Sequence, residues 1–273
     1  MPSRPTFQPL TRFSAQTRRA VRVMFTDIDD TLTTEGRLTA RAYGALEALQ
    51  QAGILVVPIT GRPAGWCDHI ARMWPADAVV GENGAFYFRY DRDARHMTRR
   101  FDQPDAIRAA NRERLMQLKE SILAAVPGAA VASDQAYRET DLAIDFCEDV
   151  PALPRGEVDR IVTLFEAAGA TAKISSIHVN GWFGDFDKLT MARRLMAEVF
   201  GIDIERENRA VAFTGDAPND APMFAFFENS IGVANVADFR DRLAASPRYV
   251  TQARGGAGFA EAADALLAAR TQR

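Results

Sequence analysis

The sequence has little cysteine, no long apolar run and no excess of basic charge. Its 273 residues include only two cysteines, Cys67 and Cys147, which lie far apart and form no CxxC pair. We therefore expect reduced thiols rather than a disulfide framework or a cysteine metal site. No segment approaches the roughly 20 continuous apolar residues that a membrane helix needs. A formal charge of −3 disfavours nucleic acid or an anionic membrane as a partner, because both require clustered basic residues.

Lysine is also scarce, since Lys119, Lys173 and Lys188 are the only lysines among 33 basic residues. In a chain that otherwise uses arginine, a lysine can indicate a need for a compact ammonium group. Apolar residues are abundant at 47%, beside 25% charged residues, a composition typical of a globular protein with a buried core. At roughly 150 residues per domain, the length predicts two domains.

The first 22 residues carry five arginines and no acidic residue. A transit peptide would explain these charges, but Pro2, Pro5 and Pro9 prevent an amphipathic helix. We therefore predict that residues 1–20 form a flexible tail that leads into the first strand. Because no apolar leader precedes that strand and the thiols are predicted to be reduced, we expect a cytoplasmic protein.

Short apolar runs alternate with helical patterns in the first 90 residues and again after residue 185. This alternation predicts an α/β fold with a doubly wound, parallel-sheet core. Strands are predicted at residues 21–26, 54–59, 78–80, 85–90, 210–214, 230–233 and 249–251. Helices are predicted at residues 39–51, 65–73, 187–200, 221–227, 237–245 and 260–270.

The pattern changes between residues 91 and 184. A long helix at 104–126, strands at 129–136 and 142–148, a helix at 156–168 and a strand at 171–183 predict an α+β layer. We interpret residues 91–184 as a cap domain that selects substrate and is inserted into a core of residues 21–90 and 185–273.

Reactive polar residues follow three predicted core strands. The first strand ends in Asp27 and Asp29, the second in Thr60-Gly61-Arg62, and a later one in Gly215-Asp216. The carboxyl ends of parallel strands share one edge of a sheet, so these side chains are expected to converge. A lone DxD is commonly a helix or turn cap. A second acidic cluster at another strand end favours a chemical role instead.

Convergent carboxylates raise one another's pKa unless a cation neutralises them. Because the expected ligands are oxygens, with no histidine or cysteine nearby, the pattern favours Mg²⁺. Asp27 and Asp216 are the predicted direct ligands, with Asn219 or Asp220 behind them. Thr60 either donates a hydrogen bond to a phosphoryl oxygen or only closes its strand.

Lys188 lies where the chain re-enters the predicted core, at the start of a helix. The helix dipole disfavours a cation at that end, so this lysine needs another reason to be there. We predict that it anchors a nucleophilic carboxylate and a phosphoryl group. The alternative is a solvated surface lysine.

The residues resemble the haloacid dehalogenase-like hydrolases. The family's DxDxT motif is matched by Asp27, Asp29 and Thr31, and its later motifs by Thr60, Lys188 and the sequence Gly215-Asp216-Ala217-Pro218-Asn219-Asp220. The position of the insertion resembles the class-IIB branch, which includes sugar-phosphate phosphatases and phosphomannomutases. The resemblance implies that Asp27 is the nucleophile and Asp29 the general acid and base. It also implies that Asp27, Asp216 and the backbone carbonyl of Asp29 bind Mg²⁺.

The substrate is less clearly indicated than the reaction. In the last predicted cap strand Ser176, His178, Asn180 and Trp182 alternate with apolar residues. This polar face either roofs a pocket for a sugar or polyol phosphate or faces solvent. Arg62 is a candidate for contacts with a substrate carboxylate. In the Glu82-Asn83 turn, Asn83 either binds a hydroxyl or only adopts the turn.

We therefore predict a magnesium-dependent phosphoric monoester hydrolase that acts on a small phosphate ester through an aspartyl phosphate. A phosphomutase is the main alternative, in which the phosphoryl group returns to a sugar. A signalling receiver would also group acids, a threonine and a lysine, but the DxDxT arrangement and the large insertion disfavour it. A non-catalytic phosphate-binding protein is disfavoured by the intact set of acids. The sequence does not indicate an oligomeric state.

Overall fold

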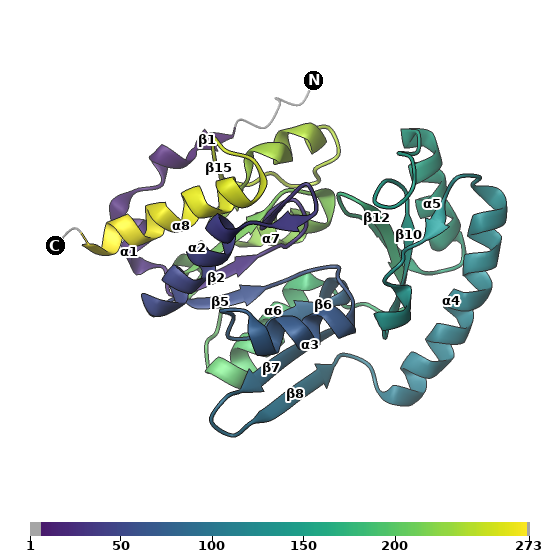
Figure 1. The fold of residues 1–273 in the computed structure, drawn as a ribbon, viewed down its shortest axis with the longest axis horizontal. Helices are drawn as coiled ribbons and strands as arrows, with labels where there is room; N and C mark the ends of the chain where they lie inside the picture. The colour runs from purple at the N-terminus through teal and green to yellow at the C-terminus, as the bar shows by residue number, and fades with distance from the viewer. Residues whose placement is uncertain (1–6, 272–273) are drawn as a thin grey trace.

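The computed structural model describes residues 7–271. Its central feature is a parallel sheet of six strands in the order β1-β15-β14-β13-β2-β5 (Figure 1). These strands are β1 (Gln8–Pro9), β15 (Tyr249–Val250), β14 (Asn229–Gly232), β13 (Val211–Gly215), β2 (Val23–Thr26) and β5 (Leu55–Pro58). The central strand β2 joins neighbours from both ends of the sequence, because it pairs with β5 on one side and with β13 on the other.

Alternate residues of β2 face opposite sides of the sheet, and helices cover both sides. Met24 belongs to a buried cluster with residues of α2 and α8, whereas Val23 and Phe25 belong to a second cluster with residues of α6 and α7. The helices involved are α2 (Ala40–Gln51), α8 (Gly255–Thr271), α6 (Lys188–Leu195) and α7 (Ala221–Phe226). The predicted doubly wound core is therefore confirmed.

A second sheet extends the core beyond β5. Strands β6 (Val79–Gly81), β7 (Phe86–Asp91) and β8 (His96–Phe101) pair in antiparallel fashion, and a bridge between Ile59 and Val80 joins them to the first sheet. Helix α3 (Ala64–Met73) packs on β6 and β7. A small hairpin of β3 (Thr33–Thr34) and β4 (Arg37–Leu38) follows β2. Although β8 lies inside the segment predicted as cap, it pairs with the core strand β7.

The cap has its own sheet and apolar core, and it lies beside the core unit in Figure 1. Its strands are ordered β11-β12-β10-β9 and its two helices are α4 and α5. The bounds are α4 (Asp105–Ala125), β9 (Ala130–Val131), β10 (Asp141–Asp145), α5 (Arg155–Ala167), β11 (Thr171–Ile174) and β12 (His178–Trp182). We use "cap" for residues 105–182, which contain these elements and the segments between them, and "core" for the other described residues. The predicted division at residues 91 and 184 stays a prediction.

Three predicted elements are wrong in detail. The strand expected at 129–136 is limited to β9, and a 3₁₀ turn follows at Gln135–Tyr137. The strand expected at 171–183 is a hairpin, because the chain reverses between β11 and β12. The hydroxyl of Ser175 accepts hydrogen bonds from the backbone of Ile177 and His178, which stabilises this reversal and places Ser176 in a turn. The helix expected at 237–245 is replaced by a 3₁₀ segment at Ala234–Phe239.

The predicted flexible tail is wrong for residues 7–20. Strand β1 pairs with β15, and α1 (Ala15–Ala20) packs on α8. Phe13 is buried and stacks on Tyr249 with ring centroids 4.7 Å apart. Burial of this ring favours an ordered segment in spite of the prolines. Residues 1–6 of the predicted tail lie outside the described residues.

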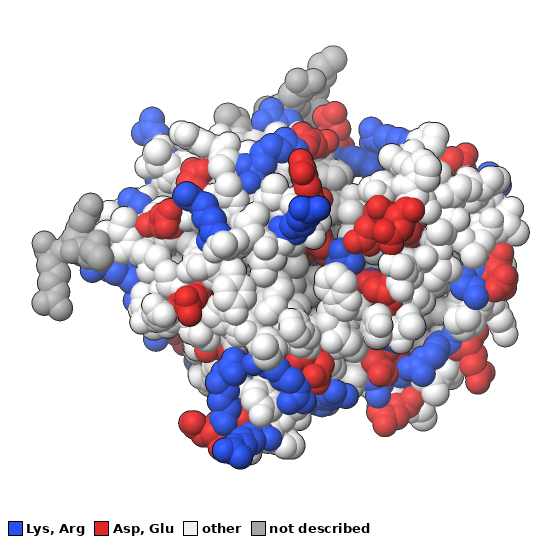
Figure 2. All heavy atoms as spheres, viewed as in Figure 1, with Lys and Arg blue, Asp and Glu red and all other residues white. Residues whose placement is uncertain are grey.

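Charged side chains of both signs are interspersed over the face shown in Figure 2. Basic residues gather on that face over the β7–β8 hairpin, where Arg89, Arg92, Arg95, Arg99 and Arg100 are accompanied by Asp91 and Asp93. Within residues 7–271, no helix is both long enough and apolar enough to span a membrane.

Candidate active site

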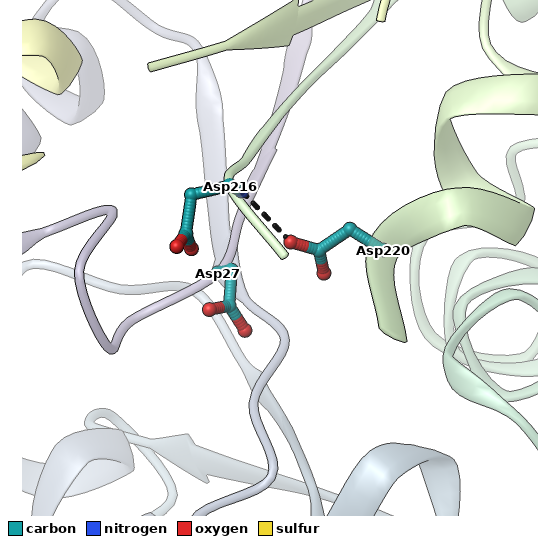
Figure 3. A group of neighbouring side chains, drawn as sticks. All are labelled: Asp27, Asp216 and Asp220. Carbon is teal, nitrogen blue, oxygen red and sulfur yellow. Dashed lines mark hydrogen bonds between the residues drawn. The ribbon is translucent and has the colours of Figure 1, made fainter. Parts of the chain in front are cut away.

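Three buried carboxylates meet where the core strands end. Asp27 directly follows β2, and Asp216 directly follows β13, while Asp220 precedes α7. Each offers an oxygen that lies within 4.8 Å of one from each of the other two. Figure 3 shows the side chains approaching from these separate segments. The sheet edge therefore brings together residues that are almost 190 positions apart, as the sequence predicts.

Lys188 supplies a buried positive charge to this cluster. Its Nζ donates to Asp27 Oδ1 at 2.6 Å and to Asp220 Oδ1 at 2.7 Å, and the side chain is 2% exposed. Burial lowers the pKa of Lys188, but the carboxylates of Asp220 and Asp27 outweigh this effect, so its pKa lies above the ordinary value. The lysine is therefore charged and holds the predicted nucleophile in place. It is not a surface residue.

A single lysine does not neutralise the three carboxylates. Burial, together with the charges of Asp220 and Asp29, raises the pKa of Asp27 to about 8, although Lys188 lowers it. Burial and then Asp27 hold the pKa of Asp216 well above its ordinary value. Such shifts indicate a site that lacks positive charge. A set of oxygen ligands that lacks positive charge in this way fits a hard divalent cation.

The hydrogen bonds show which carboxylates are already engaged. Asp220 accepts from Lys188 through Oδ1 and from the backbone of Asp216 and Ala217 through Oδ2. It therefore stabilises the loop after β13, and neither oxygen lacks a donor. Asp216 accepts from Thr31 at 2.8 Å and from Asn235 at 3.0 Å. These contacts fix its orientation toward Asp27.

Asn219 is better placed than Asp220 to give an additional ligand. Its Nδ2 donates to Asn83 Oδ1 at 3.3 Å, while its buried Oδ1 has no hydrogen-bond partner among the described residues. A buried acceptor without a donor costs free energy unless a ligand, ion or water completes it. The residues present therefore fit a metal held by Asp27 and Asp216, with Asn219 beside them.

The turn after β5 forms the floor of the site. Thr60 is completely buried, and its hydroxyl accepts from the backbone of Arg62 at 3.0 Å. A Cβ on Gly61 would lie 3.1 Å from Asn83 Nδ2 and 3.6 Å from Asn180 Oδ1, so a side chain would crowd this floor. Asn83 has a φ of 55°, a left-handed conformation that asparagine tolerates. Its Nδ2 is buried and has no partner among the described residues.

Arg62 joins the core to the cap. Its guanidinium donates to both oxygens of Asp29 at 2.9–3.0 Å and to Glu148 Oε1 at 2.6 Å, and it also donates to Asp134 at 3.2 Å. The side chain is buried beneath the ring of Trp66, 4.5 Å from its centroid. Arg62 was expected to contact a substrate carboxylate. In this structure protein carboxylates occupy the guanidinium instead.

His178 and Asn180 of β12 face this site and not solvent, since each is 2% exposed. His178 Nε2 lies 2.8 Å from Glu148 Oε2, and Asn180 donates to Asp141 Oδ2 at 2.9 Å. Together with Asp27, Asp29, Gly61, Arg62, Ser175, Ile177 and Asn219 they line a space of only about 10 Å³. Such a volume holds about one water molecule, so the cap is closed over the acids.

Sequence reasoning missed four charged cap residues near this space, of which three are buried. Asp134, Arg138 and Asp141 form one ion-pair group, and Glu148 pairs with Arg62. Burial raises the pKa of Glu148, but the hydrogen bonds from His178 and Arg62 lower it to about 2. The alternation of acids with one arginine in Ser133–Asp149 is the signal that could have identified them. The role of each site residue stays a prediction.

The comparisons with known proteins agree with this geometry. Residues 24–124 match the family model described as haloacid dehalogenase-like hydrolase. No curated protein sequence matches the chain.

Similar solved structures cover almost the whole chain. The structure of Thermoplasma acidophilum 0175 aligns with a TM-score of 0.67 and 17% identity, and the alignment covers 90% of this chain and 98% of that protein. A HAD/COF-like hydrolase from Plasmodium vivax has a TM-score of 0.67 and 16% identity, over 93% and 99%. The sucrose-phosphatase of Synechocystis sp. PCC6803, solved with sucrose and phosphate, has a TM-score of 0.62 and 15% identity, over 91% and 98%.

At such low identity these structures establish a common fold and leave activity open. The family match covers the segment that contains Asp27, Asp29, Thr60 and Arg62. The later residues Lys188 and Asp216 then complete the same buried cluster in space. Residues 24–124 are therefore similar in sequence to the haloacid dehalogenase-like hydrolases, and almost the whole chain shares its fold with the HAD/COF-like hydrolase of Plasmodium vivax.

Proposed function

We propose that this protein is a magnesium-dependent phosphatase that cleaves the phosphoric monoester of a small metabolite. The observation that carries the proposal is the buried contact of Asp27 with Lys188, with an oxygen of Asp216 within 4.8 Å of one of Asp27. A carboxylate fixed by an ammonium group, beside a site that fits a divalent cation, suits attack on a phosphorus atom.

The proposed reaction has two steps. In the first, Asp27 attacks phosphorus, the bond to the leaving oxygen breaks, and Asp29 donates a proton to that oxygen. In the second, water attacks the aspartyl phosphate, Asp29 takes the proton of that water, and inorganic phosphate leaves. Lys188 and the backbone around Thr60 are proposed to contact the phosphoryl oxygens. Mg²⁺ held by Asp27, Asp216 and the backbone of Asp29 would supply positive charge against the phosphoryl oxygens.

The leaving group is proposed to be a sugar or polyol. The cap presents His178, Asn180 and Glu148 to the closed space, and these side chains can exchange hydrogen bonds with hydroxyl groups. Asp134 and Glu148 add negative charge on the cap side of Arg62. This environment favours an uncharged, hydroxyl-bearing leaving group over one with a second anion.

A screen of phosphorylated metabolites, scored by release of inorganic phosphate, tests the proposal. We expect release that requires Mg²⁺ and stops with a chelator, together with a phosphoryl adduct on Asp27 by mass spectrometry. Asp216→Ala should weaken Mg²⁺ binding severely, as titration calorimetry would measure. Full activity without metal, or unchanged metal affinity in this variant, would contradict the proposal. Transfer between sugar positions without phosphate release would indicate a phosphomutase.

A further inference from the structure

Glu82 is a buried core carboxylate to which the proposed reaction assigns no role. It lies between β6 and β7, is 0% exposed, and has a left-handed φ of 43°. Its Oε1 accepts from the backbone of Ala64 at 3.0 Å and of Glu139 at 2.9 Å. Its Oε2 accepts from the backbone and the hydroxyl of Thr140 at 2.6 and 2.5 Å. Three of its four donors therefore belong to the cap.

Hydrogen bonds connect the cap segment that Glu82 holds to the side of the site where the leaving group is expected. Arg138 donates to Gly61 O at 2.8 Å and to both oxygens of Asp141 at 3.0 and 3.1 Å. Asp141 in turn accepts from Asn180, which lines the closed space. The hydrogen bonds from Arg138 to Asp141 and from Asn180 to Asp141 are buried, so a shift of residues 138–141 would be transmitted to Asn180.

A second branch leads from the same segment to Arg62. Arg138 donates to both oxygens of Asp134, at 3.0 and 3.2 Å. Asp134 accepts from Arg62, whose guanidinium also holds Asp29. The segment held by Glu82 therefore affects residues on both sides of the space where the leaving group is expected.

The local structure has features that packing alone would not favour. Glu82 adopts a left-handed conformation, which costs free energy in a residue other than glycine or asparagine. Burial of a carboxylate also costs free energy unless donors compensate it. These two unfavourable features occur at a residue whose side chain contacts the cap. The next residue, Asn83, contacts Asn219 of the site.

We propose that Glu82 is a positioning residue that seats cap segment 138–141 on the core and thereby aligns Asn180 and Arg62 with the leaving group. The predicted effect of Glu82 on turnover rests on the proposed phosphatase function. The predicted effect of Glu82 on the position of the cap does not, because it depends only on the hydrogen bonds in the structure.

Four variants separate this role from a general structural one. Glu82→Gln keeps the shape but turns an amide group toward the donors of Thr140. Thr140→Val removes the hydroxyl donor, and Thr140→Ser retains it. Asp77→Asn is the matched control, because Asp77 accepts from Val56 N at 2.8 Å and from Gln50 at 3.2 Å within the core. The Thr140 pair keeps the test valid if Glu82→Gln does not fold.

Hydrogen exchange of the Glu139 and Thr140 amides is the first measurement. We expect Glu82→Gln to speed their exchange at least about tenfold relative to other cap amides, since their acceptor is altered. Asp77→Asn should leave them unchanged. Unchanged protection in Glu82→Gln would overturn the proposal, whether or not the protein is a phosphatase.

Steady-state kinetics on two substrates is the second measurement. With the sugar phosphate that the screen finds to be turned over fastest, Glu82→Gln and Thr140→Val should lose about 10–100-fold in kcat/KM. With p-nitrophenyl phosphate they should lose less than about threefold. Thr140→Ser should behave like the natural protein. Equal losses on both substrates would show a merely structural role and overturn the proposal. If the natural protein hydrolyses neither substrate, the proposed function fails, and the exchange measurement alone decides whether Glu82 seats the cap.

Discussion

Lys188 and Arg62 are both buried cations that hold a motif carboxylate, yet their surroundings differ. Lys188 contacts Asp27 and Asp220, and all three residues belong to the core. Arg62 contacts Asp29 of the core, but its other two carboxylate partners, Asp134 and Glu148, come from the cap. One end of the site is therefore complete within a single unit, whereas the other depends on the position of the cap.

This difference separates two tasks that the proposed phosphatase must perform. The phosphoryl group is common to all substrates, and a rigid core can be preorganised for it. The leaving group varies, and residues on a separate unit can change without disturbing Asp27. The closed cap leaves about 10 Å³ beside Asp27 and Asp29, too little for a sugar phosphate, so we expect the cap to move when such a substrate binds. The contacts of Arg62 with Asp134 and Glu148 are those that such a movement would break.

The largest expected effect separates the carboxylates that the two cations hold. In Asp29→Asn, nitrophenolate should still leave in the first step because it needs no proton, but water attack lacks its base. General acid–base assistance is typically worth about 10²–10⁴ in rate. We expect release of about one nitrophenolate per enzyme, followed by a stall with a phosphoryl group on Asp27 that mass spectrometry locates. Asp27→Asn should show neither. Steady turnover of Asp29→Asn at the natural rate, or a phosphoryl group on another residue, would refute this assignment.

The two cations themselves provide the next test. Lys188→Met should lower kcat/KM by about 10²–10³ for every phosphate ester, since one fixed donor to the phosphoryl end is lost. Arg62→Met should reduce sugar-phosphate hydrolysis far more than hydrolysis of p-nitrophenyl phosphate. Parallel kinetics on the two substrates measures both effects, with circular dichroism as a control for folding. If both variants lost activity equally on the two substrates, the distinction between the Lys188 end and the Arg62 end of the site would be refuted.

A smaller effect is expected at the cap. His178→Ala should cost about 1–3 kcal/mol in transition-state stabilisation for a sugar phosphate, because a hydrogen-bonding group is lost and Glu148 loses a partner. Turnover of a small aryl phosphate should barely change. If both substrates lose equally, His178 has a structural role only.

The smallest expected effect is the pH dependence of stability that arises from Glu82, the residue that holds the cap on the core. Burial, followed by the charge of Asp141, raises the pKa of Glu82 from 4.5 to about 7, although Arg138 and the Thr140 donors lower it. Between these values the folded protein binds more protons at this residue than the unfolded chain. The contribution of Glu82 to the free energy of unfolding should therefore fall as pH rises from about 4.5 to 7. We expect natural protein to lose about 1–3 kcal/mol relative to Glu82→Gln across this interval, measured by urea unfolding. A constant difference between the two proteins would refute the raised pKa.

The acids and Lys188 were predictable because each stands at the end of a strand or the start of a helix. Asp27, Thr60 and Asp216 follow buried strands, and the geometry of a parallel sheet places such residues together without further information. The strand and helix positions of the core follow from apolar periodicity for the same reason. Only local signals and one topological rule were needed.

The cap side was less predictable because its contacts are made between loops. Nothing local in the sequence indicates that Glu148 would pair with Arg62 or that Glu82 would accept from Thr140. Ser176 was placed in a strand because its pattern alternates correctly, but the hydroxyl of Ser175 stabilises a reversal there. The order of residues 7–20 was missed because their partners, Tyr249 and α8, lie more than 230 positions away.

The central place of β2 also affects how the protein acquires its site during synthesis. Asp27 emerges from the ribosome early, but its strand needs β13, and its partners Lys188 and Asp216 are made 161 and 189 residues later. At about 5–20 residues per second, that delay is roughly 8–40 s. The nascent chain therefore presents an unpaired, apolar strand edge for this time, while the cap, whose sheet is made of nearby segments, can already fold. Chaperone dependence should accordingly be a property of the core rather than of the cap.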